Sequence, residues 1–79
     1  NEKIAVISFA KKYEGIEDSY QFVLSPSKNL HEAASNLFAA LRKIDKLDAT
    51  VILAEVFPNE GIGLAINDRL SRAKAENKN

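Results

Sequence analysis

The chain has 79 residues, enough for one small hydrophobic core but not for a second domain or a large enclosed active site. Eleven Lys and Arg residues balance eleven Asp and Glu residues, so no overall field draws the chain to nucleic acid or to an anionic membrane. The absence of cysteine excludes disulfide frameworks, thiolate metal sites and thiol nucleophiles, and a lone histidine cannot build a metal cluster.

No apolar run approaches the roughly 20 residues that a membrane span needs, and the first residues do not resemble a signal peptide. We therefore expect a soluble, cytoplasmic domain with no membrane partner. A strand candidate begins two residues after Asn1, so we also expect the chain to be a piece of a longer protein.

Two strands are predicted in the first third of the chain. Residues 3–9 (KIAVISF) form a continuous apolar run rich in β-branched residues, which is typical of a strand covered on both faces. Residues 20–25 (YQFVLS) predict a second, weaker strand. The segment between them is too short for an ordinary crossover helix, which leaves two alternatives: antiparallel neighbours, or non-adjacent strands joined by a loop over the sheet.

The most regular element is a helix from Asn29 to about Lys46. Its apolar residues recur at three- and four-residue steps and form one stripe of Leu30, Ala33, Ala34, Leu37, Phe38, Leu41 and Ile44. Asn29 and Glu32 fit a capping box, in which the two side chains satisfy free backbone N–H groups of the first turn.

A third strand and a second helix complete the chain. Residues 50–56 (TVILAEV) predict another buried strand, and the last helix runs from about Gly61 to Ala75, with a frayed tail. The order strand, strand, helix, strand, helix favours an α/β fold with a mainly parallel sheet of about three strands and two main helices. Such a narrow sheet would need another strand or domain at one edge.

Charged residues interrupt both helical stripes. Arg69 lies inside the stripe of the last helix and Asp45 inside that of the long helix, and an unpaired buried charge is very costly. We predict that Asp45 and Arg69 meet at the edge of the core and tie the helices together. The alternative is that Arg69 reaches solvent along its methylene groups.

Other polar residues of the two helices point away from the stripes, and a solvated face is the plain interpretation of each of them. They are Asn36, Arg42, Asn67 and Asp68, and Leu64 points outward beside Asp68. One outward leucine mildly suggests a contact surface.

Gly61 and Gly63 open the last helix and could present backbone N–H groups to a phosphate. As a dinucleotide fingerprint the pattern is incomplete, because Ile66 occupies the third glycine position and no strand follows. A tight turn and close helix packing explain both glycines better.

The sequence offers no catalytic constellation. Ser25, Ser27 and His31 lie close together, but no G-x-S-x-G elbow surrounds either serine. Glu55 and Glu60 follow a strand, where α/β sites tend to lie, but they lack a second catalytic partner.

Two ordered blocks resemble a known family: AASNLFAALRKID (residues 33–45) and EGIGLAINDRLSRA (residues 60–73). With their flanks, about residues 24–75, they are similar to the C-terminal accessory domain of two-domain threonylcarbamoyl-AMP synthases, long labelled putative translation factors. The resemblance implies a small Rossmann-like domain of two or three layers, joined by a linker to a catalytic domain. Family members usually carry a strand and a helix ahead of residue 3, so the chain is expected to be N-terminally truncated.

The resemblance also implies a parent enzyme, a nucleotidyltransferase that makes threonylcarbamoyl-AMP from threonine, bicarbonate and ATP. That product leads to threonylcarbamoyladenosine in tRNA. The catalytic and nucleotide sites of the family lie mainly in the other domain. We therefore expect residues 1–79 to be a single accessory domain that has no catalytic residue, metal or cofactor of its own.

The expected partner is the catalytic domain of the same chain. The candidates for interdomain or ligand contact are Asn36, Arg42, Asp45, Gly61, Gly63, Asn67, Asp68 and Arg69. An alternative is a small module that senses a nucleotide or tRNA near Ser25, Ser27, Glu55 and Gly61. A third possibility is a homodimer joined through sheet edges.

Overall fold

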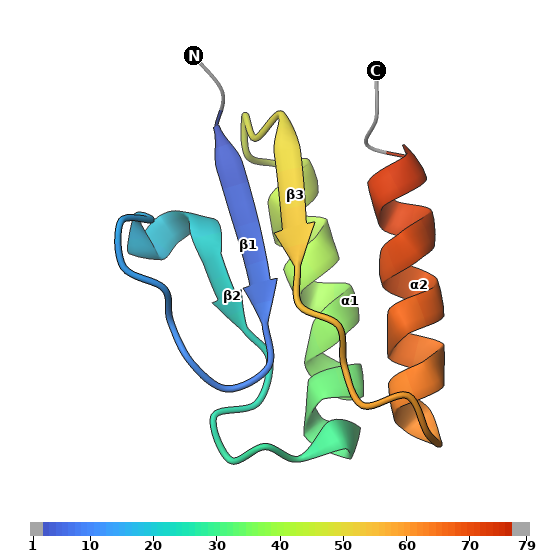
Figure 1. Ribbon diagram of the computed structural model, residues 1–79. Helices are drawn as coiled ribbons and strands as arrows, with labels where there is room; N and C mark the ends of the chain where they lie inside the picture. Colours follow the sequence, from blue (N-terminus) through green and yellow to red (C-terminus); the bar gives the residue numbers. More distant parts are fainter. Residues whose placement is uncertain (1–2, 77–79) are drawn as a thin grey trace.

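The computed structural model describes residues 3–76 (Figure 1). In chain order the elements are β1 (Ile4–Ser8), a short 3₁₀ helix η1 (Asp18–Tyr20), β2 (Gln21–Val23), α1 (Leu30–Asp45), β3 (Val51–Ala54) and α2 (Ile62–Glu76). The three strands form one parallel sheet in the order β2-β1-β3. The predicted α/β class, strand number and helices are confirmed. Helix α2 runs one residue past the predicted end, and the rest of the predicted tail lies outside the described residues.

The pairing of β1 with β2 corrects the sequence prediction. The two strands are parallel neighbours, with Val6 opposite Gln21 and Ser8 opposite Val23, so both predicted alternatives are wrong. A parallel crossover needs about a dozen residues but not necessarily an α-helix, and the segment 9–20 is long enough. The side chain of Gln21 fastens this loop: it accepts a hydrogen bond from Tyr13 N–H at 2.7 Å and donates to the carbonyls of Tyr13 and Ile16 at 2.8 and 3.1 Å.

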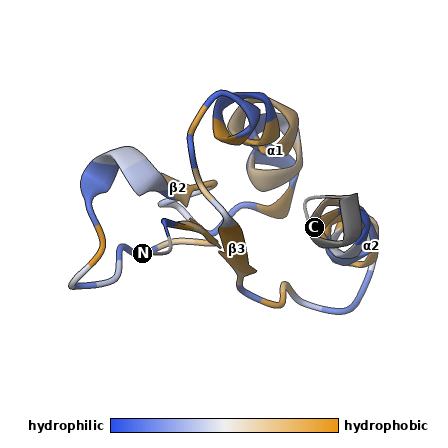
Figure 2. Cartoon of the chain, turned by 90° about the horizontal axis from the view of Figure 1, so that it is seen from above, coloured by the Kyte–Doolittle hydropathy of each residue, from blue (hydrophilic) through white to orange (hydrophobic). Residues whose placement is uncertain are grey.

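Both helices cover the same face of the sheet. Alternate strand residues, Ala5 and Ile7 of β1 and Ile52 of β3, point into one hydrophobic core because side chains alternate between the faces of a strand. That core includes buried residues of both helices: Ala33, Leu37, Ala40, Leu41 and Ile44 of α1, and Ile66, Leu70 and Ala73 of α2. Seen from above, the sheet has helices on one side only (Figure 2). The domain is therefore two-layered.

The loop after β3 seals one end of the core. Phe57 is buried, and its ring centroid lies 5.1 Å from that of Phe9, which follows β1. Tilted aromatic pairs at this separation are favourable. The loops that leave β1 and β3 therefore meet at the carboxyl end of the sheet.

Candidate interdomain surface

The two asparagines of the motif blocks hold the domain itself together. On α1, Asn36 Nδ2 donates to the carbonyl of Leu24, just after β2, at 2.7 Å. On α2, Asn67 binds Phe57 twice: Oδ1 accepts from the N–H at 2.8 Å and Nδ2 donates to the carbonyl at 2.9 Å. Each helix thus fastens the chain leaving the strand before it, because backbone groups outside a ladder need other partners.

The two glycines of the second block meet local steric needs. Gly61 has φ +57°, a conformation that glycine adopts without strain. Gly63 has ordinary φ, but a Cβ there would lie 1.7 Å from the carbonyl oxygen of Pro58. A turn and close packing therefore account for both positions, in agreement with the preferred interpretation of the sequence.

Arg69 lies between the two helices. It is half-buried, and its guanidinium carbon is 6.0 Å from the centroid of the Phe38 ring on α1. Helices α1 and α2 begin at the same end of the domain and run side by side (Figure 1). Asp45 lies seven residues, about 10 Å of helix rise, beyond Phe38 on α1. Asp45 is exposed. Its pairing with Arg69 stays a prediction.

The remaining charged candidates face solvent. Arg42 and Asp68 are exposed, and Asp68 Oδ2 lies 3.7 Å from Arg72 Nη2 one turn along α2. Exposed pairs of this kind contribute at most about 1 kcal/mol. Leu64 is 50% exposed, which confirms that it points outward.

Phe38 is the feature that sequence analysis missed. It was placed in the apolar stripe of the long helix, yet 56% of its surface is exposed. The available signal was its position one residue, about 100°, past Leu37, at the border of the stripe. We define the helix seam as Phe38 and Arg42 of α1 with Arg69 and Arg72 of α2.

Two serines considered for ligand binding cap α1 instead. Asn29 Oδ1 accepts from Glu32 N–H at 3.0 Å, which confirms half of the capping box. The other half differs: Asn29 N–H donates to Ser25 Oγ at 2.8 Å, and the Glu32 carboxylate accepts from Ser25 and Ser27. Ser25 is fully buried beneath the first turn, which brings its hydroxyl to this N–H in place of the glutamate. His31, nearby, is exposed.

Glu55 occupies the carboxyl end of the sheet. Its Oε1 accepts from Phe9 N–H at 2.7 Å, and its Oε2 accepts from the Tyr13 hydroxyl. This hydrogen bond, aided by burial and by the charge of Glu55, raises the pKa of Tyr13 above its ordinary value of 10.0. The carboxylate therefore joins the loop after β1 to the end of β3.

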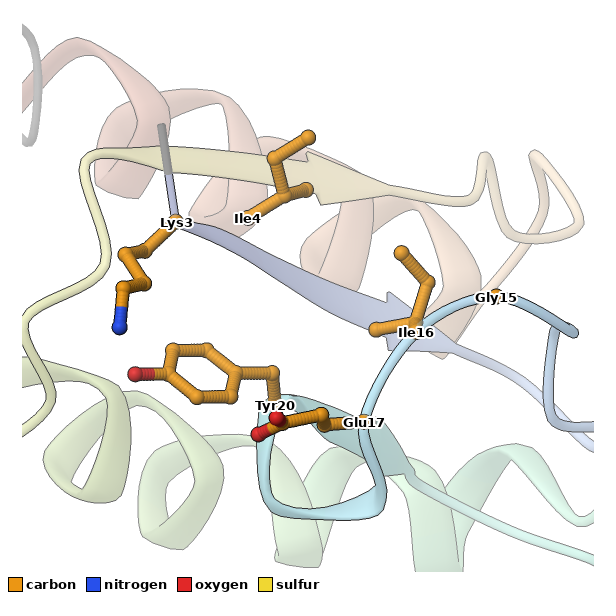
Figure 3. A pocket seen from close by; sticks show the side chains of 6 residues that line it. All are labelled: Lys3, Ile4, Gly15, Ile16, Glu17 and Tyr20. Carbon is orange, nitrogen blue, oxygen red and sulfur yellow. The ribbon is translucent and has the colours of Figure 1, made fainter. Parts of the chain in front are cut away.

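The sheet face opposite the helices carries two hollows. One of about 310 Å³ lies among Lys3, Ile4, Gly15, Ile16, Glu17 and Tyr20 (Figure 3). Beside it, Lys3 Nζ lies 3.6 Å from Asp48 Oδ2, and the Tyr20 hydroxyl donates to Asp48. That hydrogen bond lowers the pKa of Asp48, with a further contribution from Lys3, and raises that of Tyr20. The other, about 400 Å³, is lined mainly by apolar groups, including those of Val6, Ile16 and Leu53.

A metal-binding cluster and a membrane-spanning helix are both absent from the part of the chain that the structure describes. It contains no group of three or more His, Cys, Asp or Glu side chains that could hold a metal ion. Neither of its α-helices is long and apolar enough to cross a membrane.

Comparison with known proteins identifies the family. The family described as "Threonylcarbamoyl-AMP synthase, C-terminal domain" matches residues 1–75. The chain belongs to this family. The match extends the resemblance of residues 24–75 across the first strand, which the sequence blocks had not reached. The helix seam and the two strand-fastening asparagines are thus features of a threonylcarbamoyl-AMP synthase C-terminal domain.

Curated relatives agree with this family. A threonylcarbamoyl-AMP synthase of Pyrococcus abyssi (strain GE5 / Orsay) is 48% identical over 44 residues. One of Bacillus subtilis (strain 168) is 46% identical over 44 residues. Each match covers 56% of this chain and only 13% of the relative. No solved structure gives a significant match.

Proposed function

We propose that this chain is the accessory domain of a threonylcarbamoyl-AMP synthase and that it packs on the catalytic domain and its linker. The observation that carries the proposal is the family match over residues 1–75, combined with a share of only 13% of each synthase relative. A matched segment that makes up so small a part of each synthase leaves most of that polypeptide for a separate catalytic unit.

The proposal assigns no catalytic residue to the chain. Two of the polar side chains considered as nucleophile or base already bind backbone or neighbouring side chains: Ser25 in the α1 cap and Glu55 at the sheet end. A general base needs a reacting proton within hydrogen-bond reach and an open position for the substrate. The parent enzyme would use ATP, threonine and bicarbonate in its other domain, for tRNA modification in the cytoplasm.

The accessory role we propose is control of the linker or lid near the catalytic mouth. Closing segments exclude water and complete a site, and a rigid domain can hold one in place. Two hydrogen bonds join Asn67 to the backbone of Phe57, and Gly63 packs closely against the Pro58 carbonyl. These contacts hold the β3–α2 connection against α2, which suits such a support.

The test compares three proteins in threonine-dependent ATP turnover: the isolated 79 residues, the full-length synthase, and the synthase lacking this domain. The isolated chain is expected to show no turnover, and removal of the domain to lower the turnover of the remainder. Turnover by the isolated chain would overturn the proposal, and so would full activity without it. Amide shifts induced by ATP or tRNA in the isolated chain would favour the alternative of a sensing module.

A further inference from the structure

The helix seam combines an exposed aromatic ring with three arginines. Phe38 is 56% exposed and has the Arg69 guanidinium beside it at 6.0 Å. Arg42 lies four residues beyond Phe38 on α1, and Arg72 lies three beyond Arg69 on α2. Residues at these spacings are neighbours on a helix surface. The four side chains therefore form one surface across both helices.

We propose that the helix seam is the surface that docks on the catalytic domain of the same polypeptide, with Phe38 as its apolar anchor. The exposed Arg42 beside it pairs there with a carboxylate at the rim of an apolar recess. This inference rests on the proposed function and names its contact surface. The occupant follows from chain length, since more than four fifths of each synthase relative lies outside the matched segment.

The composition of the seam suits a protein interface. Aromatic and arginine side chains are enriched among the few residues that carry most of the binding energy, and they lie near the centre of such interfaces. The contact with Phe38 already restricts the Arg69 side chain, so that side chain loses less conformational entropy when a partner covers the seam.

The charges favour a protein partner over RNA. Asp45 lies three residues past Arg42, and Asp68 pairs with Arg72, so carboxylates are interleaved with the arginines. A phosphate backbone would be repelled by these carboxylates. The whole chain has zero formal net charge and a pI of about 6.8, whereas nucleic-acid-binding domains typically exceed pI 9.

Two exposed leucines outside the seam, Leu64 and Leu53, serve as internal controls. Leu64 is 50% exposed but lies about 140° around α2 from Arg69, so it faces away from α1. Leu53 is 51% exposed on the sheet face opposite the helices. A docking surface on the seam covers Phe38 and leaves Leu64 open.

The experiment is hydroxyl-radical footprinting of the full-length synthase and of the isolated 79-residue chain, compared residue by residue. The labelling of Phe38 is expected to fall roughly threefold or more in the full-length protein, because interface cores exclude water. The labelling of Leu64 is expected to remain unchanged. Protection of Leu53 without Phe38 would overturn the seam and leave the accessory role intact. Protection of neither Phe38 nor Leu53 would contradict both the docking seam and the proposed packing on the catalytic domain.

Variants of the full-length protein give a second readout. Phe38→Ala should raise the rate of protease cleavage between the domains roughly tenfold, the change expected for about 1.4 kcal/mol of lost docking energy. Leu64→Ala is the matched control and should not change this rate. Equal rates for the two variants would overturn the inference. Protection of Phe38 that appears only when tRNA is added would overturn it in favour of an RNA contact.

Discussion

Asn67 on α2 binds both backbone groups of Phe57, with its oxygen 2.8 Å from the N–H nitrogen and its amide nitrogen 2.9 Å from the carbonyl oxygen. A side chain here replaces the strand partner that Phe57 lacks after β3 ends. Asn67 is thus a structural residue of the second motif block, residues 60–73. Asp68 and Arg69 follow on other faces of the helix.

Asn67→Ala is expected to lower the free energy of unfolding by about 1–3 kcal/mol, because two backbone groups beside a buried phenylalanine lose their partners. Urea unfolding followed by circular dichroism measures the change. Asp68→Ala, the next residue and exposed, is the control and should stay within about 0.5 kcal/mol. A similar small effect for both substitutions would show that the bonds to Phe57 contribute little.

Gly63→Ala is expected to destabilise the domain by more than Gly61→Ala. The added methyl group at position 63 would overlap the Pro58 carbonyl, at 1.7 Å, so the backbone must move. At position 61 the space is open, and the cost is the left-handed conformation alone, about 1–2 kcal/mol. Thermal or urea unfolding of the two variants gives the order. The reverse order would contradict the steric account.

Ser25→Ala is expected to cost about 1–3 kcal/mol, because the buried hydroxyl serves both Asn29 N–H and the Glu32 carboxylate. Ser27→Ala, at the exposed neighbouring position, should cost less than about 0.5 kcal/mol. Unfolding curves of both variants check this. Equal losses would mean that the cap does not depend on the buried serine.

The two tyrosines predict a loss of stability at alkaline pH. Hydrogen bonds to Glu55 and Asp48 raise the pKa of Tyr13 and Tyr20 above the ordinary value of 10.0. A raised folded-state pKa stabilises the fold below pH 10, and this contribution is lost as the pH rises through the folded-state values. Tyrosinate absorbance should therefore appear at higher pH in the folded protein than in urea. Coincident titration curves would contradict both hydrogen bonds.

Asp48 is expected to make the stability of the fold fall in acid, because its pKa is lowered in the folded state. Its pKa is lowered from 3.8, chiefly by the Tyr20 hydroxyl and also by Lys3. A lowered folded-state pKa stabilises the fold above the unfolded value, and the contribution is lost as the pH falls through the lowered one. Asp48→Asn should therefore flatten the decline of the unfolding midpoint below about pH 4. An unchanged acid profile would show that Asp48 has no role in it.

The helices were predictable from sequence because their signals are local. The stripe from Leu30 to Ile44 and the cap at Asn29 placed α1 within a residue of its observed bounds. The pairing of β1 with β2 was not predictable, because the loop 9–20 looked too short for a crossover helix. The side chain of Gln21, the residue directly after this loop, holds its irregular course through bonds to Tyr13 and Ile16, and these bonds leave no periodic pattern in the sequence.

The candidate residues show the same difference between what local sequence signals predict and what only the fold reveals. Sequence periodicity showed that Asn36 and Asn67 leave the apolar stripes, but only the fold shows that they bind Leu24 and Phe57. Periodicity also assigned Phe38 to the core. A helical wheel gives the direction of a side chain, but it does not show how much of that direction the neighbouring helix covers. The seam is therefore a product of how α1 and α2 pack together.

The most direct test of the accessory role is a titration of the isotope-labelled 79-residue chain with the separately expressed catalytic domain, with and without ATP and threonine. Backbone amide shifts are the readout, and a folded catalytic domain that binds ATP is the control. The account predicts shifts clustered on α1 and α2, centred on Phe38 and Arg69. An unresponsive α1 and α2, with ATP alone shifting Gly61 and Gly63, would contradict it.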